Sequence, residues 1–104
     1  MNSATQAAQA ALKAGNYGDA LLHFEAILKA GDTSNEERIL AYQNGGACLR
    51  RLGKPDKAVN LLKQGLETYP QAPGLHHNLG NALRDLPEKP RLWQALFHFR
   101  KAYT

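Results

Sequence analysis

The chain has 104 residues, enough for one small domain with a modest core. Alanine and leucine dominate its apolar residues and β-branched residues are few, which favours helices and excludes an all-β fold. The formal net charge is +4, but 13 cationic side chains are interspersed with 9 acidic ones without a basic block, so nucleic-acid binding is allowed but not favoured.

A single cysteine, Cys48, excludes an internal disulfide. Residues 1–5 lack the cationic lead and the apolar core of a signal peptide, and no apolar run of the chain reaches the length that spans a membrane. We therefore expect a cytoplasmic protein that does not engage a membrane.

The first two predicted helices form one hairpin. An Ala/Gln-rich segment over residues 3–14 has high helix propensity and ends at Gly15, which can adopt the left-handed turn of a helix end. Asn16 is the predicted cap of the second helix, whose apolar residues recur at intervals of three and four up to about residues 30–31.

The second hairpin has the clearest boundaries. Ser34 followed by Glu37 is a capping-box pattern that starts a helix, and Gly53 ends that helix. Pro55 stands at the first position of the next helix, where a proline costs no hydrogen bond, and Pro70 follows the end of it.

A third hairpin completes the chain. Its first helix begins at about Pro73, residues 86–90 form a stiff connection that contains two prolines, and its second helix runs from about residue 91 to the end. Six helices in three antiparallel pairs therefore account for nearly every residue.

The three hairpins repeat one pattern. Apolar residues of the second helix in each hairpin recur after 37 or 38 residues: Ala20, Phe24 and Leu28; Ala58, Leu62 and Leu66; Ala95, Phe99 and Tyr103. A chain with this internal period is predicted to be a repeat protein, in which each hairpin buries its apolar face against its neighbours.

Residues 78–83, Asn-Leu-Gly-Asn-Ala-Leu, followed by Trp93, Ala95, Phe99 and Ala102, resemble the tetratricopeptide repeat. Gly46 and Gly80 lie 34 residues apart, which is the period of that family. The resemblance implies an all-α fold, a right-handed superhelical array of three helix-turn-helix hairpins (six helices). It places one domain over residues 1–104, with repeats at about 1–34, 39–72 and 73–104.

The chain departs from this family pattern at two junctions. Four extra residues fall between the first two repeats, around residues 31–35, and three extra residues lengthen the turn at residues 87–90. The first repeat also has Ala8 where Gly46 and Gly80 stand in the others.

By resemblance, the chain is a non-catalytic module that binds a peptide or protein partner on the concave face lined by the first helix of each hairpin. Among the side chains that project onto that face, ten are predicted to bind the peptide: Gln9, Lys13, Gln43, Asn44, Arg50, Arg51, His77, Asn78, Asn81 and Arg84. The amides suit a peptide backbone, and Lys13, Arg50 and Arg84 could form a ladder for the carboxylates of an acidic partner.

A purely local origin of these cations stays open, because each lies in the last turn of a helix, where the helix dipole favours positive charge. Chaperone-binding members of the family use a two-carboxylate clamp, and here only Asn44 falls at a matching position. A chaperone tail is therefore not the expected partner.

No catalytic, metal or cofactor site is predicted. His76 and His77 are adjacent on a helix and point about 100° apart, so they cannot chelate one ion together. Cys48 lies between apolar neighbours on a packed helix, which indicates a small buried hydrophobe rather than a nucleophile. We therefore expect neither enzyme activity nor a cofactor.

The last predicted helix is apolar around most of its circumference, whereas a terminal repeat needs a polar outer face. Its predicted self-association surface comprises Trp93, Leu96, Phe97 and Tyr103. A homodimer, a further part of a longer protein, or the lengthened turn folded over these rings would each cover it. Self-association as a scaffold is one alternative function, and RNA binding by basic helical hairpins is a second, less favoured one.

Overall fold

The computed structural model describes residues 3–87 and 92–103, with the backbone alone for residues 92 and 93. This part of the chain is all-α, as predicted. Its six helices are α1 (Ser3–Lys13), α2 (Tyr17–Lys29), α3 (Asn35–Arg51), α4 (Pro55–Thr68), α5 (Pro73–Asp85) and α6 (Leu92–Ala102).

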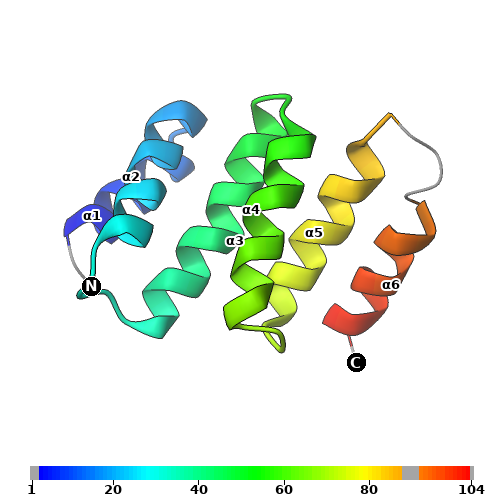
Figure 1. Ribbon diagram of the computed structural model, residues 1–104. Helices are drawn as coiled ribbons and strands as arrows, with labels where there is room; N and C mark the ends of the chain where they lie inside the picture. Colours follow the sequence, from blue (N-terminus) through cyan, green and yellow to red (C-terminus); the bar gives the residue numbers. More distant parts are fainter. Residues whose placement is uncertain (1–2, 88–91, 104) are drawn as a thin grey trace.

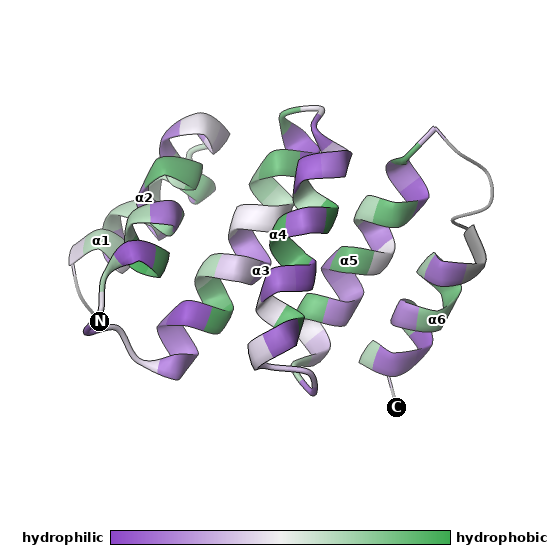
Figure 2. Cartoon of the chain, in the orientation of Figure 1, coloured by the Kyte–Doolittle hydropathy of each residue, from purple (hydrophilic) through white to green (hydrophobic). Residues whose placement is uncertain are grey.

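The helices form three hairpins laid side by side, α1 with α2, α3 with α4 and α5 with α6 (Figure 1). The array is elongated, with principal dimensions of 39 × 26 × 20 Å. Each helix packs on the next along the chain, and α3 also packs along α5, whereas α1 and α3 touch at few positions. Hydrophobic and hydrophilic residues are interspersed along every helix (Figure 2), so each helix can bury an apolar face and expose a polar one.

Small residues at the helix crossings allow the two helices of a hairpin to approach closely. A Cβ added at Gly46 would lie 2.7 Å from side-chain carbons of Leu62, and one added at Gly80 would lie 3.1 Å from the carbonyl oxygen of Ala95. Ala58, which is fully buried, belongs to the same core cluster as Leu62. The close crossings predicted from the repeat pattern are therefore present.

The predicted helix boundaries hold, with one exception at a cap. Gly15 and Gly53 have φ angles of 78° and 76°, the left-handed conformation expected after α1 and α3. Ser34 accepts a hydrogen bond from the Glu37 amide at 3.1 Å, as its capping pattern predicts. Asn16 precedes α2, but its side chain makes no capping bond to the described start of that helix, because its backbone (φ −85°, ψ 72°) is not extended as that of Ser34 is.

The four residues predicted to enlarge the junction around residues 31–35 instead add one turn of helix. Gly46 lies 11 positions after the first residue of α3, whereas Gly80 lies seven positions after the first residue of α5. Tyr69 donates a hydrogen bond to Asn35 at 2.9 Å and so ties the added turn to the end of α4. The extra turn lengthens α3 beyond its partner helices.

The Gly46–Leu62 contact predicts a specific mutational effect. Gly46→Ala should destabilise the fold by about 1–3 kcal/mol, because Leu62 is fully buried and has no room to move away from a new Cβ. Denaturant unfolding measures the change.

Gly18→Ala on α2 is the matched control, since nothing lies within 4 Å of a Cβ there. It should be neutral or stabilising by up to about 1 kcal/mol, the helix-propensity gain of alanine over glycine. Equal effects of the two substitutions would contradict the close crossing.

Candidate functional site

A groove runs between α1 and α3 on the face lined by the first helices of the hairpins. It consists of two adjoining hollows that share Gln9. The larger one has a volume of about 580 Å³ and is lined by Gln6, Gln9, Ala10, Leu12, Lys13 and Asn44. The smaller one, of about 350 Å³, is lined by Gln9, Ser34, Glu36, Glu37 and Leu40. We call the two together the α1–α3 groove.

The extra turn of α3 closes one end of this groove. The Thr5 hydroxyl of α1 is buried and donates a 2.6 Å hydrogen bond to one carboxylate oxygen of Glu37. The Ser34 hydroxyl lies 3.3 Å from the other oxygen of the same carboxylate. These contacts join the first turns of the two helices, so α1 and α3 run in the same direction on either side of the groove.

Charge is distributed unequally along the groove. Glu36 and Glu37 line the end formed by the first turn of α3, while Lys13 lines the end formed by the last turn of α1. The side-chain amides of Gln9 and Asn44 lie among the lining residues between these ends. The groove therefore has an acidic end, an uncharged middle and a basic end.

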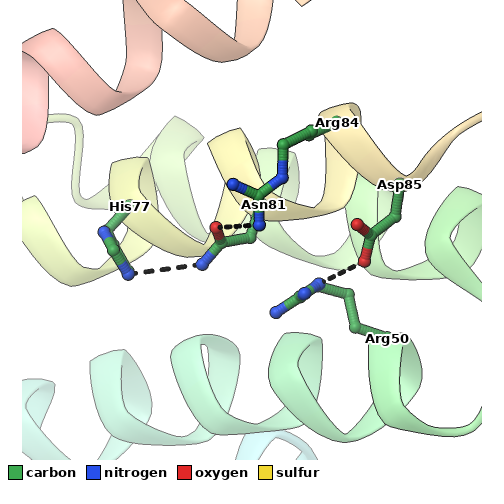
Figure 3. Close-up of polar contacts among 5 residues, drawn as sticks. All are labelled: Arg50, His77, Asn81, Arg84 and Asp85. Carbon is green, nitrogen blue, oxygen red and sulfur yellow. Dashed lines mark hydrogen bonds and ion pairs between the residues drawn. The ribbon is translucent and has the colours of Figure 1, made fainter.

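A chain of side-chain hydrogen bonds follows α5 (Figure 3). Arg84 donates to Asn81 at 3.3 Å, and the Asn81 amide lies 3.3 Å from Nε2 of His77. Because that amide nitrogen can only donate, Nε2 accepts, and the His77 proton is assigned to Nδ1, which donates to the Tyr103 hydroxyl at 2.6 Å. The chain links the predicted residues of α5 to the end of α6.

The predicted cation ladder does not form as an open row. Arg50 makes a 2.6 Å ion pair with Asp85 across α3 and α5, the contact also drawn in Figure 3. The Arg84 guanidinium lies over the Phe99 ring at 5.7 Å and that of Arg51 over the Tyr17 ring of α2 at 5.8 Å. Arg50 and Arg51 thus contact different neighbours.

Two further predicted residues hold helices together. The Asn78 side chain donates a 2.8 Å hydrogen bond to the backbone carbonyl of Gln43, which ties α5 to α3. The Gln43 side chain lies against Gly74, where a Cβ would clash with it. Of the ten predicted residues, only Gln9, Lys13 and Asn44 line the α1–α3 groove.

Side chains of the predicted self-association surface differ in their surroundings. Leu96 and Phe97 are 68% and 56% exposed, while Tyr103, though 74% exposed, bonds to His77. The side chain of Trp93 lies outside the described residues.

Among the described residues, no group of three His, Cys, Asp or Glu side chains is placed to hold a metal ion. Cys48 is buried, and desolvation raises the pKa of its thiol to about 11, as befits a core residue. No helix in the described ranges is long and apolar enough to cross a membrane.

Three features of the structure were not predicted from the sequence: the groove-lining positions of Gln6, Glu36 and Glu37, the extra turn of α3, and the pairing of His76 with His98. Gln6, Glu36 and Glu37 line the groove, yet Glu37 was interpreted only as a capping residue. Comparing the distances from each helix start to Gly46 and Gly80 would have shown the extra turn that carries the two glutamates. The pairing of His76 with His98, described below, had no local signal, because the two residues lie 22 positions apart on different helices.

The fold and the groove define a helical-repeat protein with an open face between its first two hairpins. Residues 41–82 match the sequence model of the tetratricopeptide repeat, which together with the fold supports the assignment to that family. Its members are generally non-catalytic protein-interaction modules. The chain is also 37% identical over 60 residues to the human protein IFIT1 homolog B, an alignment that covers 58% of this chain and 13% of the relative.

The Arg50–Asp85 pair should contribute little to stability, because both side chains are partly exposed. Asp85→Asn is expected to lower the free energy of unfolding by less than about 1 kcal/mol. Asp32→Asn, at an exposed position between α2 and α3, is the control for losing one acidic charge. A loss above about 2 kcal/mol, measured by denaturant unfolding, would show a structural role for the pair instead.

Proposed function

We propose that the chain binds an extended segment of a partner protein in the α1–α3 groove. The observation that carries this proposal is the pair of adjoining hollows joined at Gln9. Few contacts between α1 and α3 leave this space open, while α3 and α5 are packed together. An extended segment, rather than a compact ligand, suits a space that follows two helices in parallel.

The lining suggests how such a segment would be held. The amides of Gln9 and Asn44 can each donate to and accept from a peptide backbone, while Leu12 and Leu40 offer apolar contact to its side chains. Lys13 suits a carboxylate and Glu36 suits a cationic group. We therefore propose a partner segment with an acidic group at its Lys13 end and a basic group at the opposite end.

A longer partner would continue across α5. Arg84 is exposed, and His77 and Asn81 are half-buried beside it. Arg50 is a weaker candidate for binding a carboxylate because Asp85 already pairs with it, and Gln43 and Asn78 serve the contact between α3 and α5. We accordingly place the main ligand contacts at Gln9, Lys13 and Asn44.

A displayed library of random 12-residue peptides, selected on the chain and followed by titration of the enriched peptides, tests this proposal. Gln9→Ala and Asn44→Ala should each weaken binding by about tenfold, the loss of one or two hydrogen bonds to a ligand backbone. Gln71→Ala, on the loop before α5, is the matched control and should change affinity less than twofold.

Charge reversal tests the direction of the bound segment. Lys13→Glu should weaken the binding of peptides that have an acidic group at one end. Glu36→Lys should weaken the binding of peptides that have a basic group at the other end. Enriched peptides that bind all four groove variants as tightly as the unchanged chain would refute the groove as the site.

Self-association through α6 is a second candidate function, favoured by the exposed side chains of Leu96 and Phe97. Apolar side chains adjacent on one helix suit burial against the same helix of a second copy, and Trp93 and Tyr103 remain proposed members of that surface. Sedimentation equilibrium should then show a dimer that Leu96→Gln or Phe97→Gln dissociates. Leu22→Gln on α2, where the leucine is 66% exposed, should leave it intact. A monomer at all concentrations would end this proposal.

A further inference from the structure

Helix α6 is joined to α5 by a pair of histidines, of which His76 is buried and His98 is half-buried. His76 on α5 is only 7% exposed, and its Nδ1 lies 2.9 Å from Nδ1 of His98 on α6. Its other ring nitrogen, Nε2, lies 2.8 Å from the backbone carbonyl of Pro70. We refer to these two residues as the His76–His98 pair.

The hydrogen-bond partners determine where the protons of the pair lie. The Pro70 carbonyl can only accept, so His76 carries its proton on Nε2 and presents the lone pair of Nδ1. His98 must then donate from its own Nδ1 to close the 2.9 Å contact. Only one proton fits between the facing nitrogens, so the pair cannot keep this bond with both rings fully protonated.

The adjacent residue, His77, makes a second polar tie to the same helix. It points to another side of α5 and bonds to the Tyr103 hydroxyl at 2.6 Å, near the end of α6. Two neighbouring histidines of α5 therefore supply polar contacts to α6.

The surroundings of His98 oppose a positive charge. Burial is the main cause that lowers its pKa from 6.5, followed by the charges of His76 on α5 and Lys63 on α4. Another ring neighbour is Phe97, whose ring meets that of His98 at 84°. The charged groups that lower the pKa of His98 from α4 and α5 are thus both bases.

We propose that the His76–His98 pair is a pH-sensitive latch, which keeps α6 docked on α5 at neutral pH and weakens that docking in mild acid. A histidine that binds its proton less tightly when docked favours undocking as the pH falls. Docking is therefore complete above about pH 6.5 and weakens progressively below it. The proposal does not depend on what the α1–α3 groove binds.

Release of α6 would change the surface at this end of the array. Ala95 and Phe99 would leave the α5 face around Gly80, where Leu79 and Leu83 are now buried in the same cluster. An apolar face of α5 would become accessible in acid, together with His77 and the hydrogen-bond chain it belongs to.

Amide hydrogen exchange of the full chain at pH 7.5 and pH 5.5, corrected for the intrinsic exchange rates, tests the latch. Protection of α6 should fall by up to about tenfold at pH 5.5, the limit for one histidine with an unperturbed pKa of 6.5. Protection of α2 should stay constant. His98→Gln, whose amide can donate to His76 without titrating, should remove most of the pH dependence of α6.

His23→Gln on α2 is the control and should keep the pH dependence of α6. If α6 is not docked in His98→Gln at pH 7.5, an NMR pH titration of the unchanged chain tests the latch instead. The latch requires the α6 amide signals to shift together with the His98 ring signals, at a midpoint below pH 6.5. Equal loss of protection in His98→Gln and the unchanged chain, or a His98 midpoint at or above 6.5, would overturn the proposal.

Discussion

The close crossing of the two helices in the second and third hairpins is the constraint on which the structure depends. Glycine at positions 46 and 80 lets Leu62 and the Ala95–Phe99 segment lie almost against the opposite backbone. Once two helices are held this closely, larger apolar residues fill the space beside the crossing, and each hairpin presents its next face to the following one.

Variation on this repeat, rather than the repeat itself, produces the features that suggest function. An added turn at the start of α3 brings Glu37 to Thr5 and closes one end of the α1–α3 groove. Polar groups on the next pair of helices are instead satisfied internally, as when Arg50 pairs with Asp85 and Asn78 binds the Gln43 carbonyl. The face that looks uniformly polar in the sequence is therefore open over α1 and α3 and occupied by its own contacts over α5.

Helix positions could be predicted because their signals are local. Proline at residue 55, glycine at residues 15 and 53 and the Ser34 cap each act on the backbone within a few residues. Projection onto a helix face could identify Gln9, Lys13 and Asn44, but it could not show that Asp85 neutralises Arg50, because that depends on side chains 35 residues apart. The His76–His98 pair was missed for the same reason, and the extra turn because an insertion was assumed to lie in a loop.

The central claim is that a partner segment occupies the α1–α3 groove. Chemical-shift mapping by NMR, with an enriched 12-residue peptide added to the isotopically labelled chain, tests it most directly. The account predicts that the largest changes fall on α1 and the first half of α3, including the side-chain amides of Gln9 and Asn44. Changes confined to α5 and α6, or to the outer helices α2 and α4, would contradict it.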